Sequence, residues 1–473
     1  MLFNSFHYLF FLLVVLFVVE SVRHRNFLHT FLLIASYYFY WTSTSGVYVA
    51  LLVASTYLDF FCGRAIHQSA DPARKRFYLL LSLLGNLGTL GYFKYTNFAI
   101  DAVQGFSEAF GWHPELRHLE IYLPIGISFY TFIKLGYILD VYWGKLIPAL
   151  SFKKFAIFIA FFPHLVAGPI LRARDFLPQL ERPVCITWDN LRIGLTLVVY
   201  GLIKKVCIAD NLSGFVKETF TGELTNDSVV VILASIAFAI QIYCDFSGYT
   251  DIAIGSAKIL GFTFPENFNH PYFSPNITEF WRRWHMTLSS WLRDYLYIPL
   301  GGNRMGKARQ CLNLLVTLVL AGLWHGAAWN FLFWGFYHGL LLVGHKLMLA
   351  ERRIMSGRVW DPFKIAFTFW LTCIGWIIFL IPDPAKLVFY LKKMLLLGFS
   401  TPELGAFVHS HGLVLFVMVL FFLFHAISYW LDGLSRVFVA LRVPAWATCM
   451  FSGIVTLYFL GAGQQQSFIY FQF

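Results

Sequence analysis

Long apolar runs separated by short polar loops fill this chain from end to end. A helix that crosses a bilayer needs about 20 mostly apolar residues. Only 13% of the residues are charged, about half the share found in soluble domains, so the chain cannot cover a water-facing surface of its size. We therefore predict an all-α, polytopic membrane protein with about twelve transmembrane helices. The candidate runs lie near residues 6–22, 27–41, 46–62, 77–97, 121–141, 190–209, 228–248, 310–326, 329–349, 363–381, 412–430 and 444–461.

Basic residues are concentrated in alternate loops between these runs. The loop after residue 62 carries Arg64 and three more basic residues at 74–76, whereas loop 98–120 carries four acidic residues against Arg117 alone. Cytoplasmic loops of membrane proteins are enriched in Lys and Arg. We therefore expect an external N-terminus, with loop 98–120 outside the cell and segment 276–309 inside.

Segment 155–171 does not fit this alternation as a simple span. It is apolar, yet basic residues flank it on both sides, and it contains Pro163 and Gly168. A re-entrant segment that enters and leaves from the cytoplasm resolves the conflict. Irregular backbone at membrane depth persists only where it is buried in protein or lines a wet cavity, so we expect the chain to enclose a cavity. A true span with misleading flanking charges is the alternative.

The longest weakly apolar stretch, at about 259–309, is predicted to be a cytoplasmic amphipathic-helix region within a single domain covering 1–473. Asn276 and Glu279 have the spacing of a helix-starting capping box. One face of a helix over 276–296 carries aromatic and leucine side chains, and the opposite face carries Arg282, Ser289 and Arg293, which is typical of a helix lying along a membrane. His285 falls between the two faces, where a structural role is the more common one.

The loop after this helix is basic and rich in glycine. Residues 301–308 fit the spacing of a phosphate-binding P-loop, but Ala308 stands where Ser or Thr must hold magnesium, and no strand precedes the loop. Backbone amides together with Arg304 and Lys307 could still contact a diphosphate. Ordinary cytoplasmic positive charge is the alternative explanation. The seven cysteines are scattered and include no C-x-x-C pair, so we predict no metal site.

His325 lies about fifteen residues along an apolar run. An ionisable residue within a membrane segment is costly and suggests a function. Gly322 and Gly326 would let a neighbouring backbone approach at the level of the imidazole, and a neutral imidazole can act as a general base toward a hydroxyl. A hydrogen-bonded packing histidine is the alternative. His338 is a weaker second candidate.

Two acids near a helix end, Asp245 and Asp251, are expected to pair with arginines or histidines of the core.

Several long motifs resemble those of membrane-bound O-acyltransferases, and in particular the bacterial alginate O-acetyltransferase branch. The likeness runs nearly from end to end. The matching segments are 281–302, 322–326 with Asn330, 162–170, 243–251 and the terminal 468–473.

This resemblance implies a ring of membrane helices around a central cavity, with the family's catalytic histidine matching His325 and its second motif histidine matching His285. It implies acetyl-CoA in the cytosol as the acyl donor and no permanently bound cofactor. The acetyl group would cross the bacterial inner membrane to an extracytoplasmic esterase-like acetyltransferase partner and a polysaccharide acceptor. The chain would contact membrane lipid and no nucleic acid.

Two other functions stay open at this point. D-alanyl transfer to teichoic acids would need a carrier protein docking on segment 276–309 instead of free coenzyme A. A polytopic transporter would be expected to show inverted repeats and more intramembrane charge, neither of which is evident.

Overall fold

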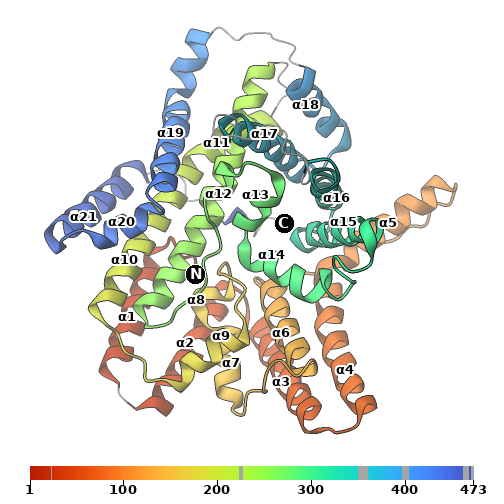
Figure 1. The fold of residues 1–473 in the computed structure, drawn as a ribbon, viewed down its shortest axis with the longest axis vertical. Coiled ribbons are helices and arrows are strands. Elements are labelled where there is room, and N and C mark those ends of the chain that lie inside the picture. The colour runs from red at the N-terminus through yellow and green to blue at the C-terminus, as the bar shows by residue number, and fades with distance from the viewer. Residues whose placement is uncertain (23, 223–226, 350–360, 397–403, 462–467, 470–473) are drawn as a thin grey trace. The chain divides into compact units, whose positions relative to one another are not determined.

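The computed structural model describes residues 1–22, 24–222, 227–349, 361–396, 404–461 and 468–469 (Figure 1). Within these ranges the regular structure is entirely helical and contains no β-strand, as predicted. The chain divides into two compact units. Unit 1 comprises Met1–Gly194 with Ser256–Pro265, and unit 2 comprises Leu195–Gly255 with Glu266–Phe473. The prediction of a single domain stays a prediction.

Five of the described helices are long and apolar enough to cross a membrane, which confirms a multi-pass membrane protein. Each of the twelve predicted runs coincides with a helix, but the number of crossings and their arrangement as a ring stay predictions. The five helices are α3 (Gly46–Gln68), α12 (Ser228–Ile259), α17 (Asp361–Leu380), residues Phe407–Trp430 of α19 (Leu404–Trp430), and α21 (Val443–Leu460).

Unit 1 begins with helices whose starts follow ordinary capping chemistry. Asp71 precedes α4, and its carboxylate accepts a hydrogen bond of 2.9 Å from the backbone N–H of Ala73, while Pro72 occupies the first helical position, where its missing N–H costs nothing. Besides α3, the elements of this unit are α1 (Phe6–Ser21), α2 (Arg25–Ser43), α4 (Pro72–Leu90), the π-helical turn η1 (Gly91–Tyr95), α5 (Thr96–Ala109), α6 (Ile127–Tyr142), α7 (Phe152–Ala160), α8 (Phe162–Leu165), α9 (Ala173–Phe176) and η2 (Leu177–Glu181).

The predicted re-entrant segment 155–171 is a broken helix. Helix α7 ends at Ala160, and α8 resumes after Phe161 for a single turn. The nine residues of α7 are about 14 Å long at 1.5 Å per residue, about half of the ~30 Å hydrocarbon core. Almost every side chain from Phe155 to Leu171 is buried, as expected for irregular backbone enclosed in protein. Its entry and exit from one face of the membrane stay a prediction.

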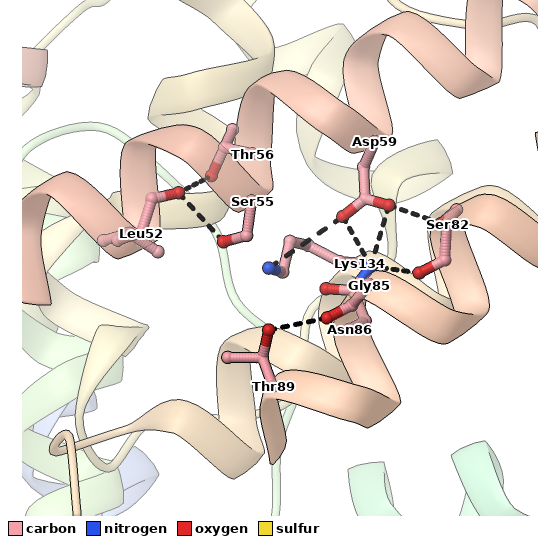
Figure 2. Close-up of polar contacts among 9 residues, drawn as sticks. All are labelled: Leu52, Ser55, Thr56, Asp59, Ser82, Gly85, Asn86, Thr89 and Lys134. Atoms are coloured by element: carbon pink, nitrogen blue, oxygen red, sulfur yellow. Dashed lines mark hydrogen bonds and ion pairs between the residues drawn. The ribbon is translucent and has the colours of Figure 1, made fainter. Parts of the chain in front are cut away.

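A cluster of buried polar side chains joins three helices of unit 1 (Figure 2). The carboxylate of Asp59 in α3 accepts hydrogen bonds from Ser82 and from Asn86 Nδ2 of α4, the latter at 2.8 and 2.9 Å. Lys134 Nζ of α6 lies 3.9 Å from the same carboxylate, and all four side chains are buried. Because an isolated buried charge is very costly, these four groups stabilise one another only while the three helices stay packed.

Unit 2 carries the histidine-bearing motifs. Its helices α15 and α16 lie side by side as an antiparallel hairpin (Figure 1). A Cβ on Gly322 would overlap the carbonyl oxygen of Phe331, and one on Gly335 would overlap that of Leu318, so the predicted close backbone approach is confirmed at Gly322. At Gly326 the close neighbour is instead the Phe331 ring. The remaining elements are α10 (Trp188–Leu202), η3 (Ile203–Ala209), α11 (Asp210–Thr221), η4 (Pro271–Phe273), α13 (Ile277–Arg283), α14 (Met286–Leu292), η5 (Arg293–Tyr297), α15 (Gly306–His325), α16 (Trp329–Gly344), η6 (His345–Leu349), α18 (Pro384–Leu396) and α20 (Leu434–Ala440).

The predicted continuous helix over 276–296 is wrong in one respect. The helix starts as expected, since Asn276 caps it by accepting from the Glu279 N–H at 2.9 Å. It breaks at Trp284 and His285, because His285 has a left-handed backbone with φ of 42°, a conformation that ends an α-helix. The predicted faces agree with burial at Phe280 and Trp284, which are buried, and at Arg282, which is exposed. The placement of His285 at the boundary between the faces is wrong, because the helix breaks there and the side chain is fully buried.

Candidate functional site

His325 is the last residue of α15, and the extended backbone of Gly326 ends the helix immediately after it. Its side chain is only 4% exposed. Three aromatic rings surround the imidazole, with centroid separations of 5.0 Å to Trp324, 5.1 Å to Trp334 and 5.6 Å to Phe379. The imidazole therefore sits in an aromatic, largely water-excluded chamber built from α15, α16 and α17.

His285 is fully buried at the break between α13 and α14. Its Nδ1 lies 3.1 Å from the side-chain oxygen of Asn267. That Asn267 atom must be an oxygen, because it also accepts the backbone N–H of Thr287 at 3.2 Å and the Thr287 hydroxyl at 2.8 Å. Nδ1 of His285 therefore carries the hydrogen and donates it, so that Nε2 of the neutral ring has a lone pair.

This lone pair is available to another molecule. Nε2 of His285 is buried and has no hydrogen-bond partner among the described residues. Burial also lowers the pKa of His285 to about 3, because the charged form is poorly solvated there. At neutral pH the ring is therefore uncharged, as an acceptor or a base must be.

The two predicted catalytic histidines both pack against the indole ring of Trp324. The Trp324 ring centroid is 6.0 Å from His285 and 5.0 Å from His325. The structure thus brings two residues that are 40 positions apart in the sequence close to one aromatic ring. One aromatic ring contacts both imidazoles.

Unsatisfied polar atoms gather around this pair. Nε1 of Trp281, Nε1 of Trp334, both ring nitrogens of His338 and the side-chain oxygen of Asn330 are buried without a hydrogen-bond partner among the described residues. The Trp334 ring is 4.9 Å from His338 and 5.7 Å from Trp281. Leaving a buried polar group unpaired costs about 1–3 kcal/mol. Such a concentration marks a place where water or a bound ligand supplies the missing partners.

A cavity of about 760 Å³ adjoins this chamber at Trp281. Three basic side chains line it, Arg282, Arg293 and Lys346, against one acid, Glu279. Glu279 pairs with Arg283 at 2.9 Å and with Arg282 at 3.5 Å, and Arg293 pairs with Asp294 at 2.9 Å. An anionic ligand is favoured by this charge balance. The other lining residues are Asn276, Thr278, Ser289, Leu292, Tyr297, Asn303, Leu314, Thr317, Leu318, Leu342 and His345.

The predicted donor-binding residues Arg304 and Lys307 are exposed beside this cavity, not in its wall. Their neighbour Asn303 lines it. Gly301, Gly302 and Gly306 all have positive φ, between 52° and 109°, which explains the glycine-rich sequence. Arg282 and Arg293 could have been proposed from the polar face of the predicted helix. Lys346 has no comparable sequence signal, because it lies in η6, just beyond the C-terminal end of α16.

Asp245 and Asp251 form ion pairs, as predicted, but the partners are lysines of η3. Lys205 Nζ lies 2.5 Å from Asp245 and 2.8 Å from Asp210, and Lys204 pairs with Asp251. Arginine and histidine were the expected partners, and that detail was wrong. In the described ranges, no group of three or more His, Cys, Asp or Glu side chains could hold a metal ion.

Comparison with known proteins places this site in a family. The sequence model of the membrane-bound O-acyltransferase family matches residues 145–381, which include both histidines. A probable alginate O-acetylase, AlgI, of Pseudomonas aeruginosa is 42% identical over 387 residues, covering 80% of this chain and 72% of the relative. A peptidoglycan O-acetyltransferase of Helicobacter pylori is 35% identical over 357 residues, 70% of this chain and 67% of the relative. A teichoic acid D-alanyltransferase of Bacillus subtilis is 30% identical over 288 residues, 56% and 71% respectively.

Proposed function

Since the chain belongs to the membrane-bound O-acyltransferase family and is therefore an O-acyltransferase, we propose that it moves an acetyl group from cytosolic acetyl-CoA across the bacterial inner membrane for O-acetylation of an exopolysaccharide. The observation that carries this proposal is the buried pair His325 and His285 on one indole, beside a basic cavity. The predicted ring of twelve helices would surround the route between donor and acceptor.

The cavity suits the donor side of the reaction. Arg282, Arg293 and Lys346 can pair with the phosphates of coenzyme A, and Trp281 leads from the cavity to the ring of Trp334, which contacts His325. We propose that Arg304 and Lys307, which are exposed beside the cavity, contact the donor outside its wall. A thioester reaching past Trp281 would arrive at the imidazoles with its anionic part still held outside.

His325 then acts as the general base. The acceptor hydroxyl attacks the thioester carbonyl, its proton passes to the neutral imidazole, and the new C–O bond forms as the C–S bond breaks. The proton is returned to the leaving coenzyme A thiolate, so no net charge remains on the enzyme. The buried N–H of Trp334 has no hydrogen-bond partner among the described residues and can donate to the oxyanion that develops on the carbonyl.

The relatives favour a polysaccharide as the final acceptor. Identity is 42% to the alginate O-acetylase and 30% to the D-alanyltransferase. An extracytoplasmic esterase-like partner would complete the transfer, because the proposed donor is cytosolic and the polysaccharide lies outside. The D-alanyl relatives keep D-alanyl transfer as the second candidate, with a carrier protein as donor.

Purified full-length protein in nanodiscs tests the proposal. Acetyl-CoA, butyryl-CoA and a D-alanyl carrier protein are offered separately, and release of free thiol by hydrolysis or by transfer to an added polysaccharide hydroxyl is followed. We expect thiol release from acetyl-CoA that depends on His325. Release from the D-alanyl carrier protein alone would support the second candidate and refute the first.

A further inference from the structure

A second cavity in unit 2 lies among candidate membrane-spanning helices and shares no lining residue with the first. We propose that this α19–α21 groove binds a neutral bilayer amphiphile of the acylglycerol class, with its hydroxyl or ester end at Lys204 and His425. The groove measures about 410 Å³, within the range of about 300–1,000 Å³ typical of small-molecule sites. This inference does not depend on the acyltransferase reaction.

The walls of the groove indicate a lipid tail. They come chiefly from α19 and α21, two of the candidate membrane spans. Phe416 of α19 lines the groove and is itself 59% exposed, so the groove opens on the surface that faces lipid. Gly453 of α21 lets that helix pack closely against α10, since a Cβ there would lie 2.9 Å from Val199 Cγ1, so the two helices close the wall of the groove at this point. An acyl chain entering from the bilayer needs only such an apolar channel.

The polar part of the groove indicates the head group. Lys204 Nζ contacts Asp251 and donates to Ser247 Oγ at 3.0 Å, which uses two of its three N–H groups. His425 also lines the groove, is 6% exposed, and its Nε2 has no hydrogen-bond partner among the described residues. The ring of Tyr243 joins the two, at 5.8 Å from Lys204 Nζ and 5.2 Å from His425.

The charge balance favours a neutral head. Lys204 is the one fully charged side chain among the described lining residues, and Asp251 already offsets it. A phosphate or carboxylate head would bring a second anion beside Asp251 at low dielectric, which is costly. A hydroxyl or ester can instead accept from Lys204 and pair with His425 without adding charge.

The volume argues against a transmembrane helix as the occupant. A helix with its side chains is about 10 Å across and rises about 5.4 Å per turn. The groove volume of about 410 Å³ would therefore hold about one turn. An acyl chain fits within it over many carbons.

The binding test uses radiolabelled monoolein with full-length protein in detergent. Competition is measured with oleate, oleylamine and octadecene, which share the chain length but differ in head group. We expect saturable binding of one monoolein per chain, and competitors weaker by about three- to tenfold, the value of one lost hydrogen bond. The proposal would be overturned by equal competition from octadecene, by a preference for oleate or by non-saturable uptake. All three outcomes are measured on the unmodified protein.

Variants then place the ligand. Leu420→Trp enlarges a side chain that lines the groove and should abolish saturable binding, whereas Gly412→Leu on α19, where a Cβ meets open space, should leave it intact. His425→Phe keeps the aromatic packing and should remove the preference for monoolein over octadecene. Unchanged binding in correctly folded Leu420→Trp would contradict the assigned site. A co-purifying polypeptide that blocks monoolein in the unmodified protein would identify a protein occupant and also contradict the proposal.

Discussion

At the scale of single residues, the site depends on how His285 is oriented. The Asn267 oxygen accepts from His285 Nδ1 and from two groups of Thr287, so it fixes both the tautomer of the imidazole and the start of α14. Asn267 lies 18 residues before His285 and has no motif of its own. It is a positioning residue that sequence reasoning missed.

Substituting Asn267 tests this role. Asn267→Leu leaves three buried donors without an acceptor and should lower acetyl transfer at least tenfold, since each unpaired group costs about 1–3 kcal/mol. Asn267→Asp keeps the acceptor and should restore much of the activity. A carboxylate also favours the imidazolium and raises the pKa of His285 from about 3. If turnover needs neutral His285, the acid limb of the pH–rate profile should then move to higher pH in Asn267→Asp than in the unmodified enzyme. Superimposable pH profiles would contradict a role for His285 in turnover.

At the scale of elements, the apolar runs predicted helices at the right places, because the bilayer dictates their length and composition. The break at His285 could not be predicted this way, because a left-handed residue there depends on the distant Asn267. The lysine partners of Asp245 and Asp251 lie inside the predicted apolar run 190–209, where no sequence pattern singles them out. The pattern of apolar runs thus located the helices, while contacts between distant residues determine where a helix breaks and which side chains form ion pairs.

The hairpin of α15 and α16 makes a stability prediction. Gly322→Ala would push a methyl group into the Phe331 carbonyl. Overpacking of this kind typically costs about 1–3 kcal/mol, so we expect the protein to be destabilised by about that much. Gly344→Ala, at the end of α16 with open space around it, should be neutral or stabilising, because alanine favours helix by about 1 kcal/mol. Thermal unfolding in detergent compares the two variants. A Gly322→Ala protein as stable as Gly344→Ala would refute the close approach.

The buried cluster of α3, α4 and α6 makes a second stability prediction (Figure 2). Asp59→Ala leaves Lys134 buried without its carboxylate, and we expect a loss of about 3–5 kcal/mol. Lys134→Met should be similarly harmful. The double variant should lose clearly less than the sum of the two, because no lone charge remains. Strict additivity in unfolding measurements would show that the 3.9 Å pair contributes nothing.

At the scale of the whole molecule, the charge pattern predicts which loops face the cytoplasm. Single cysteines at Glu108 and Lys307, on a cysteine-free background, should react with an impermeant thiol reagent from opposite faces of the membrane. Glu108 should label from outside intact cells, and Lys307 only after permeabilisation. The wild-type sequence contains seven cysteines, so the background variant must first be shown to retain activity. Labelling of both positions from the same face would refute the predicted orientation.

The central claim is that His325 is the general base, and turnover per folded molecule tests it most directly. Acetyl transfer is measured for His325→Gln and His325→Ala, each normalised to monodisperse protein. Glutamine keeps polar bulk in the aromatic chamber but cannot take a proton at neutral pH. We predict that both variants fold and that both lose about 10²–10⁴-fold in rate. A His325→Gln enzyme with near-normal turnover would contradict the claim and leave His325 as a packing residue.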